Sequence, residues 1–349
     1  MAYTTIDDPE AHFQVVTYTG NGSANNAITL PGDTDMQPDL VWIKNRDATD
    51  SHCMFDAVRG ATKVIHSDAD DAESTDTDTL DSFTSDGFQV DADVKVNTNT
   101  EKYVAWCWKA NGSGSGNTAG DMASTVSANA TAGFTIVTYD GEKNSGDTFG
   151  HGLGLVPAFM VFKNTEISGG WTAFHGKNTA APETDYLIPS DTTATTDHNE
   201  RWYDTMPTST LVTVGDDNGV NADGNIIVSY IWSDIQGFSK FGSYKGNGDA
   251  DGTFVYTGFR PALVITKRTD STSSWDMTDS KRGYNNSNPF LRANGTYAED
   301  TDGEQTLLSN GFKPENTNAD CNADGGTYVY AAFAEAPFVN SNGVPCNAR

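Results

Sequence analysis

The chain has 349 residues, a length that allows two or three domains, each with its own core. Its 21 Lys and Arg face 48 Asp and Glu, a formal net charge of -27, so nucleic-acid backbones and anionic membrane surfaces would repel it. Although only 36% of residues are hydrophobic, 17 Phe, 13 Tyr and 7 Trp supply large rings for cores, which excludes a disordered acidic chain.

The chain shows no targeting or membrane segment. The stretch before Phe13 has neither a basic nor an apolar region, and no apolar run approaches the ~20 residues needed to span a bilayer. Four cysteines, Cys53, Cys107, Cys321 and Cys346, lack the CxxC spacing of a metal site. We therefore expect no export, no membrane insertion and free thiols in a reducing cytoplasm; bonds between Cys53 and Cys107 or between Cys321 and Cys346 are the alternative.

Three segments of the chain follow the same order of signals, which indicates an internal repeat. Each begins with an aromatic run closed by glycine, reaches a proline followed by an apolar run that ends in lysine, and closes on an aromatic strand. The prolines are separated by 119 and 104 residues (157 − 38 and 261 − 157), and the opening phenylalanines by 121 and 104 (134 − 13 and 238 − 134). The repeat unit is thus a whole module. Its landmarks are Phe13, Phe134 and Phe238, and Pro38, Pro157 and Pro261.

Within each module, short β-branched and aromatic runs are broken at roughly ten-residue intervals by Gly, Asn, Asp, Ser and Thr. This pattern predicts an all-β fold of three tandem β-sandwich modules, jelly-roll or lectin-like. The expected units are module 1 over residues 1–110, a flexible Gly/Ser linker over 111–132, module 2 over 133–236, and module 3 with a C-terminal tail over 237–349. The linker should let module 1 move, whereas modules 2 and 3 should pack as one rigid unit because almost no spacer separates them.

No arrangement of residues singles out a catalytic site. Carboxylates are abundant but none stands out as a pair, and no GxSxG, Walker or dinucleotide-binding motif is present. Lys44, Lys163 and Lys267 each follow an apolar run, so we interpret them as strand-end residues with snorkelling stems. The six histidines lack metal-site spacing and are expected on the surface or in loops. They are His12, His52, His66, His151, His175 and His198. We therefore expect a protein without enzymatic activity.

Aromatic residues in loop-like contexts are candidates for ligand binding, because an aromatic face stacks on the apolar face of a sugar ring. Trp171, Trp202, Tyr203 and Trp275 lie in such contexts. Core packing is the alternative for each of these side chains.

Acidic turns are candidates for calcium, because hard cations take clustered carboxylate oxygens. The turn Asp249-Ala-Asp-Gly252 makes Asp249 and Asp251 the candidate ligands. The acid-rich stretch 68–78 is a second candidate. Solvated turns are the alternative in both places, since neither has an EF-hand register, and no other cofactor is expected.

Several strings in the chain resemble a family of tail-fibre-like or virion structural proteins of marine tailed phages. The resemblance covers nearly the whole chain, and the family has no catalytic signature to carry over. The strings are Ala2-Tyr-Thr-Thr-Ile-Asp-Asp-Pro9, Pro38-Asp-Leu-Val-Trp-Ile-Lys-Asn-Arg46, Phe55-Asp-Ala-Val-Arg-Gly60, Phe241-Gly-Ser-Tyr-Lys-Gly-Asn-Gly248 and Tyr328-Val-Tyr-Ala-Ala-Phe-Ala-Glu335. The resemblance implies a location in a virion, after synthesis in the host cytoplasm.

The repeat, the missing catalytic constellation and the resemblance together predict a non-catalytic virion structural protein. It would present β-sandwich modules on the particle surface, either for host adsorption as a tail fibre does or as a capsid or tail decoration. Expected partners are further copies of the chain in a homo-oligomer, other virion proteins and a host surface glycan or receptor. The alternative is a polysaccharide-degrading tailspike enzyme, which would need a pair of carboxylates in a cleft.

Overall fold

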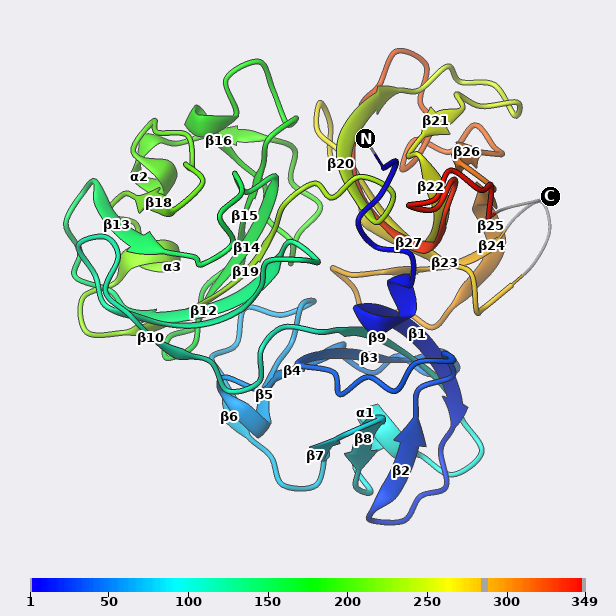
Figure 1. Cartoon of the computed structure of the whole chain (residues 1–349), viewed down its shortest axis with the longest axis horizontal. Coiled ribbons are helices and arrows are strands. Elements are labelled where there is room, and N and C mark those ends of the chain that lie inside the picture. Colours follow the sequence, from blue (N-terminus) through cyan, green and yellow to red (C-terminus); the bar gives the residue numbers. More distant parts are fainter. Residues whose placement is uncertain (1, 284–287, 347–349) are drawn as a thin grey trace.

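The computed structural model describes residues 2–283 and 288–346, and its chain forms three β-rich lobes around a common centre (Figure 1). The lobes are modules 1, 2 and 3, taken here as residues 2–110, 111–236 and 237–346. The predicted all-β class is confirmed, since helices contribute only single turns to the described residues. Within the same residues, no helix has the length and apolarity needed to cross a bilayer.

Module 1 is a two-layered sandwich. Its main sheet has the strand order β1-β9-β3-β4-β5-β6, and a smaller sheet, β2-β8-β7, packs on one face. The elements are η1 (Pro9–Ala11), β1 (Phe13–Thr19), β2 (Asn26–Thr29), β3 (Leu40–Asn45), β4 (Cys53–Asp56), β5 (Gly60–Ile65), β6 (Ser74–Thr75), β7 (Leu80–Thr84), β8 (Gly87–Val90), α1 (Val94–Asn97) and β9 (Lys102–Trp108). The apolar run after Pro38 forms β3, a central strand between β9 and β4 as its composition indicates.

Module 2 repeats this arrangement with the main sheet β10-β11-β12-β19-β14-β15 and two small two-stranded sheets. The elements are β10 (Ser115–Asn117), β11 (Ser124–Asn129), β12 (Phe134–Asp140), β13 (Asp147–Gly150), β14 (Phe159–Asn164), β15 (Thr172–His175), η2 (Pro182–Thr184), β16 (Asp185–Tyr186), β17 (Thr196–Asp197), α2 (Asn199–Trp202), β18 (Leu211–Val214), α3 (Asn218–Asn221) and β19 (Ile226–Trp232). The prediction of a flexible linker over residues 111–132 is wrong, because β10 and β11 extend this sheet and bury Met122 and Val126.

Module 3 consists of one eight-stranded sheet, β20-β27-β22-β23-β24-β25-β26-β21. Its strands are β20 (Ser239–Lys245), β21 (Val255–Tyr256), β22 (Phe259–Arg268), β23 (Trp275–Asp279), β24 (Asn288–Arg292), β25 (Asp300–Leu308), β26 (Gly311–Pro314) and β27 (Thr327–Pro337). Strands β20 and β21 follow each other in sequence yet lie at opposite ends of the sheet order, and the sheet curls into a nearly closed barrel (Figure 1).

The main sheets of modules 1 and 2 are buried on both faces, because successive side chains of a strand point to opposite sides. In β3, Val41 and Ile43 face the core inside module 1, whereas Leu40 faces the centre of the molecule. Strand β14 repeats the alternation, with Phe162 inside module 2 and Phe159 facing the centre. The centre-facing side chains of all three modules form one continuous hydrophobic core. Module 1 is therefore packed against the other two modules. The prediction that a flexible linker lets module 1 move is wrong.

Each module contacts the next through equivalent groups, and the three interfaces close into a ring. In each interface an aromatic ring N–H donates to a carbonyl of the preceding module. The three donors are spaced by 119 and 104 residues, the same offsets that separate the repeated prolines. The bonds join Trp171 Nε1 to His66 O (2.9 Å), Trp275 Nε1 to Ile188 O (2.9 Å) and His52 Nε2 to Arg292 O (3.0 Å). Head-to-tail interfaces of one kind close in this way only when their rotation completes a circle.

Two of the three interfaces also contain a buried Asp–Arg pair that holds an aromatic side chain of the neighbouring module. Asp279 Oδ2 in module 3 accepts bonds from Arg282 Nε (2.6 Å) and from Trp106 Nε1 of module 1 (3.0 Å). The equivalent Asp56 Oδ2 in module 1 accepts bonds from Arg59 Nε (2.5 Å) and from Tyr230 OH of module 2 (2.7 Å). These networks fix the modules in register because each buried polar atom requires its partner.

In the third interface a histidine takes the place of the aspartate. His175 Nε2 lies 3.1 Å from Tyr330 O, and its Nδ1 accepts the Lys177 N–H at 3.1 Å. Burial lowers the pKa of His175 to about 4, so the ring is neutral at physiological pH. His52 and His151 are also fully buried but lie in loops, so among these three residues the expectation of surface or loop histidines is wrong only for His175, which ends β15. Two of them lie where another module covers a strand end, which a local sequence pattern does not reveal.

Lys44, Lys163 and Lys267 are fully buried, so the prediction of snorkelling stems is wrong. Their ammonium groups donate to backbone carbonyls because the loop of a neighbouring module or of the same module covers each strand end. Lys163 Nζ reaches Asp70 O of module 1 at 2.9 Å, and Lys267 Nζ reaches Thr192 O of module 2 at 2.9 Å. The repeated lysine thus holds loops in place through buried hydrogen bonds to their backbone carbonyls.

Burial of these ammonium groups predicts a rise in stability with pH. Desolvation lowers the pKa of Lys44 and of Lys163 to about 8, against 10.5 for an exposed lysine. Above pH 8 the unfolded chain therefore binds more protons than the folded chain, and the free energy of unfolding should increase by up to about 1.4 kcal/mol per pH unit for each lysine. The rise should end near pH 9, because unfolded cysteines ionise there while burial raises the pKa of the Cys53 and Cys107 thiols.

Urea denaturation between pH 7.5 and 9.5 measures this effect. The Lys163→Met variant is the control, since it should lose that residue's share of the slope. A free energy of unfolding that is flat or falls between pH 8 and pH 9 would contradict the assigned burial of the charged groups.

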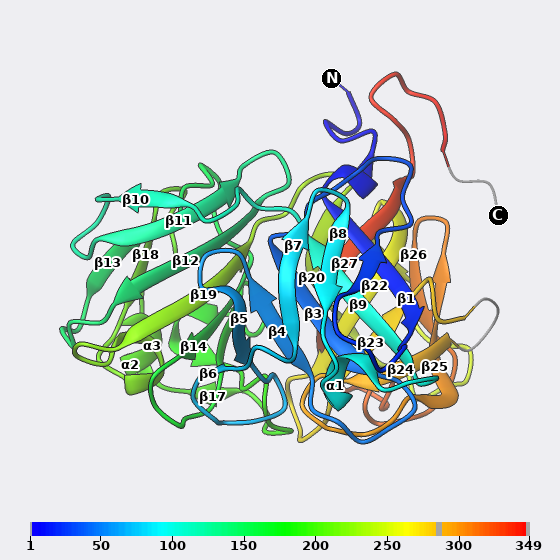
Figure 2. The same cartoon turned by 90° about the horizontal axis from the view of Figure 1, so that it is seen from below.

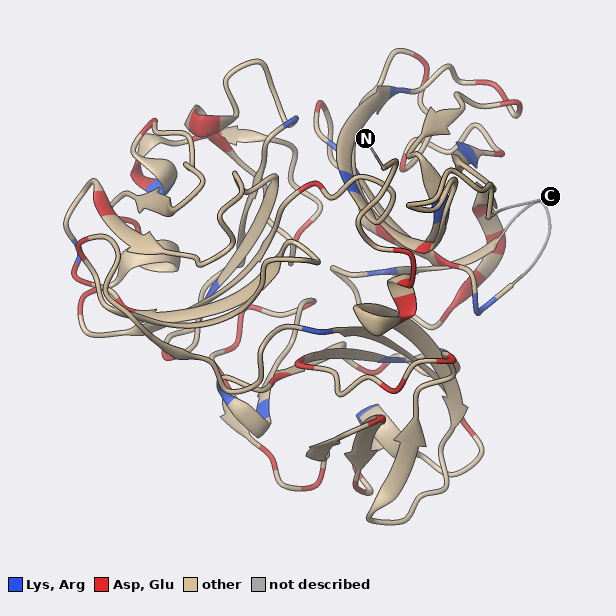
Figure 3. Ribbon diagram, in the orientation of Figure 1, with Lys and Arg blue, Asp and Glu red and all other residues tan. Residues whose placement is uncertain are grey.

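The two ends of the described chain meet on one side of the molecule (Figure 2). Ser341 N donates to Asp7 Oδ1 at 2.7 Å, and Tyr3 OH donates to Gly258 O at 2.7 Å, so the first residues lie on module 3. Acidic residues are spread along the outer loops of all three modules (Figure 3). This distribution keeps the negative charge on the surface, where water and counterions screen it.

Candidate functional site

Three of the four aromatic residues predicted to bind a ligand are buried. Trp171 and Trp275 are 1% and 4% exposed and form the ring of interfaces, with both indole N–H groups bonded to another module. Trp202 is 1% exposed, packs on Phe162 and donates to Asp185 O at 3.0 Å. Their faces are not open to a sugar ring, so the prediction of exposed stacking platforms fails for these three tryptophans.

Tyr203 is the exception, with half of its surface exposed. It ends α2 in the left-handed conformation (φ 50°, ψ 41°). Gly146 lies directly beside its ring, where an added Cβ would come within 3.1 Å of the ring edge. Its role in ligand binding stays a prediction, and the structure brings none of the three predicted tryptophans to its side as a common platform.

The predicted calcium ligands Asp249 and Asp251 lie on an exposed loop of module 3. Asp251 forms an ion pair with Lys313, and Asp249 Oδ1 accepts the Asp251 N–H at 3.0 Å. Within the described residues these two carboxylates do not belong to a group of three or more metal-ligand side chains. The two aspartates therefore stabilise the turn through these contacts.

The centre of the ring offers little room for a ligand. A cavity of about 40 Å³ lies among apolar side chains that include Trp42, Trp108, Trp232 and Phe333. That volume would hold no more than about three water molecules, and an apolar lining gives water no partners. The centre is therefore a packing feature and carries no binding site for an organic ligand.

A polar cleft of about 420 Å³ lies where module 1 meets module 2. Its lining includes Asp70 of module 1 and Ser190, Asp191, Arg201 and Asp217 of module 2. Ser190 Oγ donates to Asp70 Oδ1 at 2.9 Å across the module boundary. The size lies within the range of small-ligand pockets, and its carboxylates and hydroxyl suit a hydroxyl-rich ligand such as a glycan.

Arg201 is the cation of this cleft. Its Nη1 donates to Asp217 Oδ1 and to Thr172 Oγ1 (3.0 Å), and its guanidinium lies 4.5 Å from the centre of the Tyr186 ring. Its Nε is buried without a hydrogen-bond partner in the part of the chain that the structure describes. The cleft was missed in the sequence because its lining comes from several separate loops of two modules.

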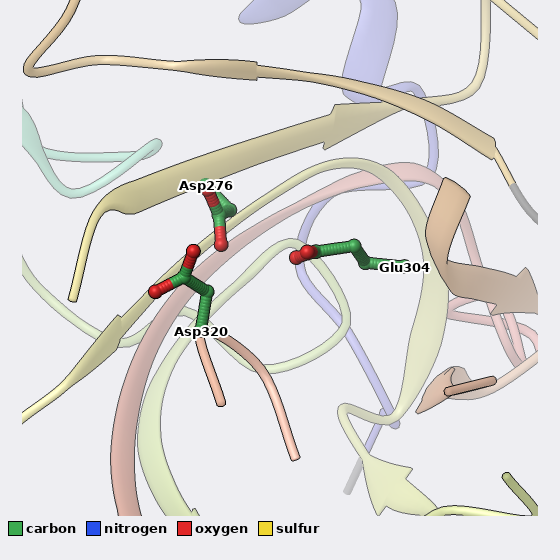
Figure 4. Close-up of side chains that lie close together, drawn as sticks. All are labelled: Asp276, Glu304 and Asp320. Carbon is green, nitrogen blue, oxygen red and sulfur yellow. The ribbon is translucent and has the colours of Figure 1, made fainter. Parts of the chain in front are cut away.

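A second polar site is buried in module 3, where Asp276 of β23, Glu304 of β25 and Asp320 of the loop before β27 come together (Figure 4). One carboxylate oxygen of each lies within 4.8 Å of the others. Asp276 and Glu304 are buried, and Asp320 is partly exposed. Burial and the neighbouring carboxylates raise the pKa of Asp276 well above its usual range. This is the one group of three carboxylates with metal-ligand spacing among residues 2–283 and 288–346.

All four cysteines are free thiols, as expected, and three of them are buried. Burial raises the pKa of Cys107, and it is the first cause of the raised pKa of Cys53. Buried, protonated thiols are poor nucleophiles and poor metal ligands. The three buried cysteines therefore contribute to packing.

Comparison with known proteins identifies the family. No curated protein and no solved structure matches the chain. A family model described as "Domain of unknown function (DUF7483)" matches residues 8–337, which contain all three main sheets and all three interfaces of the ring. The unit of this family is therefore the whole ring, and the chain belongs to the DUF7483 family.

Proposed function

We propose that the chain is a non-catalytic structural protein of a phage virion that presents its three modules on the particle surface. The observation that carries the proposal is the closed ring, in which the repeated polar and aromatic residues bind one module to the next. Three linked copies of one module around a common centre suit a component that meets a symmetric particle. The resemblance to phage structural proteins supports a location in the virion, after synthesis in the host cytoplasm.

The buried titratable groups support a structural role. Asp56 and Asp279 each bind an arginine and an aromatic donor, so their carboxylates have no free face for a substrate. His52 Nδ1 accepts the Trp42 indole N–H (2.9 Å), and its Nε2 is bonded to Arg292 O of module 3. A general base needs an accessible lone pair in reach of a substrate, which these groups do not offer.

The proposed partners are further copies of the chain, other virion proteins and a host surface glycan. The cleft between modules 1 and 2 supports the glycan, because its carboxylate and hydroxyl groups can bind sugar hydroxyls. A decoration protein would bury this region against its neighbours in a lattice, whereas an adsorption protein would leave it open to the medium.

Electron cryomicroscopy of the intact particle tests the proposal. We expect three-lobed density at symmetric positions on the capsid or tail, with the cleft exposed in an adsorption protein and covered in a decoration protein. Finding the chain in infected cells but not in purified particles would contradict the virion assignment.

The alternative of a polysaccharide-degrading tailspike rests on the three carboxylates of the cleft, Asp70, Asp191 and Asp217. Incubation of the purified protein with host polysaccharide should yield no new reducing ends. If shorter products form, and if the Asp191→Asn variant stops their formation while its fold is intact, the protein is an enzyme and the non-catalytic proposal is wrong.

A further inference from the structure

The carboxylate cluster of module 3 lies at a position that the other two modules also possess. Strand pairing aligns Asp276 with Thr172 and Cys53, because these residues pair with Thr266, Phe162 and Ile43 in equivalent strands. The offsets are again 119 and 104 residues (172 − 53 and 276 − 172).

The loop that carries Asp320 is also repeated. In each module a side-chain oxygen accepts the backbone N–H of the residue two positions later, ahead of a closing strand. The acceptors are Asp93, Asp217 and Asn318, and the donors are Lys95, Gly219 and Asp320. Asp320 therefore occupies the position of Lys95 in module 1 and of Gly219 in module 2.

Modules 1 and 2 place a side-chain cation at this position. Lys95 Nζ lies 3.1 Å from Asp93 Oδ2, and its charge opposes the effect of burial on the pKa of the Cys53 thiol. In module 2, Arg201 Nη1 fills the space beside Gly219 and donates to both Asp217 and Thr172. In modules 1 and 2 the positive charge at this position is therefore supplied by a side chain.

Module 3 has carboxylates at this position instead. The nearest cation paired with Asp276 is Arg292, whose Nε lies 3.9 Å from Asp276 Oδ1, beyond hydrogen-bonding distance. Arg292 also pairs with Asp300 at 3.6 Å and lies over the Phe290 ring. Lys267 is nearby, but its ammonium group donates to Thr192 O and Ser273 O. Modules 1 and 2 contain the equivalent lysine as well, and each still has a further cation, Lys95 or Arg201, at this position.

Three buried oxygens of the cluster lack donors, whereas Glu304 Oε1 accepts a bond from Asn318 Nδ2 and Asp320 Oδ1 accepts one from Ser273 Oγ. Both carboxylate oxygens of Asp276, which is 0% exposed, and Oε2 of Glu304 have no hydrogen-bond partner among the described residues. Figure 4 shows the Asp276 carboxylate pointing toward Asp320 and Glu304. Buried carboxylates without a compensating charge cost several kcal/mol, so a site of this kind requires a counter-charge or a proton.

We propose that these three carboxylates bind one Ca²⁺ ion, which supplies to module 3 the positive charge that a side chain supplies to the other two modules. Ca²⁺ takes carboxylate oxygens in a flexible geometry, whereas Mg²⁺ demands a near-octahedral site and is usually bound by one or two carboxylates and several waters, so three carboxylates favour Ca²⁺. One oxygen of each carboxylate lies within 4.8 Å of the others, so the three side chains can contact a single ion. In the absence of an ion, burial and then the Glu304 charge raise the pKa of Asp276.

Calorimetric titration of the EDTA-treated full chain with CaCl₂ tests this site. We expect one Ca²⁺ per chain, and a Ca²⁺-dependent rise in the melting temperature. The Asp276→Asn and Glu304→Gln variants should bind at least about 10–100-fold more weakly, since even an outer-shell partner of a metal contributes that much. The matched control is the Asp249→Asn, Asp251→Asn double variant, in which two acids of an exposed loop are changed and binding should persist.

Each outcome bears on the proposal. Absence of Ca²⁺ binding by the wild-type chain, unchanged binding by Glu304→Gln or loss of binding in the control variant would overturn it. Equal or tighter binding of Mg²⁺ would overturn the assignment to Ca²⁺. If Asp276→Asn fails to fold, Glu304→Gln, with its near-ultraviolet circular dichroism as a check of packing, decides alone. None of these results depends on whether the protein is part of a virion.

Discussion

Replacing Asp279 by alanine should lower the free energy of unfolding by about 3–5 kcal/mol, because it leaves a buried guanidinium without its main partner. Asp279 and Arg282 both have fully buried side chains and are joined by a 2.6 Å bond. The same carboxylate accepts the Trp106 indole N–H of module 1. The variant would therefore break an ion pair and an inter-module hydrogen bond together, and would leave Glu299, 3.2 Å from Arg282 Nη1, as the carboxylate beside the charge.

Urea denaturation followed by tryptophan fluorescence measures this loss. Asp81→Ala changes an exposed acid and should alter the free energy of unfolding by no more than about 0.5 kcal/mol. Trp106→Phe separates the two contributions, because it removes the indole donor but leaves the Asp279–Arg282 pair intact. A loss below about 1 kcal/mol in Asp279→Ala would show that the pair is solvated and that this interface is not closed.

Replacing Trp108 by alanine should cost about 3–5 kcal/mol and should destabilise all three modules together. The Trp108 ring is 4.8 Å from that of Phe13, 6.0 Å from that of Trp232 and 5.3 Å from that of Phe333, so it contacts rings of modules 1, 2 and 3. Its loss would leave a cavity in the shared core, next to the small one already present.

Hydrogen exchange of the native protein, resolved by peptide, shows where the effect appears. Protection should fall in the central strands of every module. Tyr203→Ala, which removes a half-exposed ring, should leave that protection unchanged. Loss of protection confined to module 1 would contradict the shared core.

The sequence predicts the repeat and the class of fold because both depend on local patterns. Period-two runs and turn residues mark the strands, and the offsets of 119 and 104 residues recur in the residues that form the ring. The linker was mispredicted because a Gly- and Ser-rich composition reports flexibility of the isolated chain. Here β11 pairs with β12, β10 pairs with β11, and Val126 is buried.

The burial of Trp171, Trp275 and the repeated lysines could not be predicted from their own neighbourhoods. Each lies at a strand end or in a loop that would be exposed in an isolated module, and each is covered by a loop of another module or of its own. A contact between modules depends on how the ring closes, which no local period encodes.

The carboxylate cluster was missed for a related reason. Its three acids lie on separate elements, and acids are abundant throughout the chain. The signal that would have revealed them is the comparison of repeats, where Cys53 and Thr172 give way to Asp276 and where Lys95 gives way to Asp320. Two new acids at aligned positions of one copy point to a site that the other copies do not share.

Closure of the three modules into one ring is the claim on which the proposed function depends, and small-angle X-ray scattering of the full chain in solution tests it most directly. A compact 349-residue body should have a radius of gyration of about 20 Å. A radius of gyration above about 25 Å, as expected for compact modules strung along flexible connections, would contradict the ring.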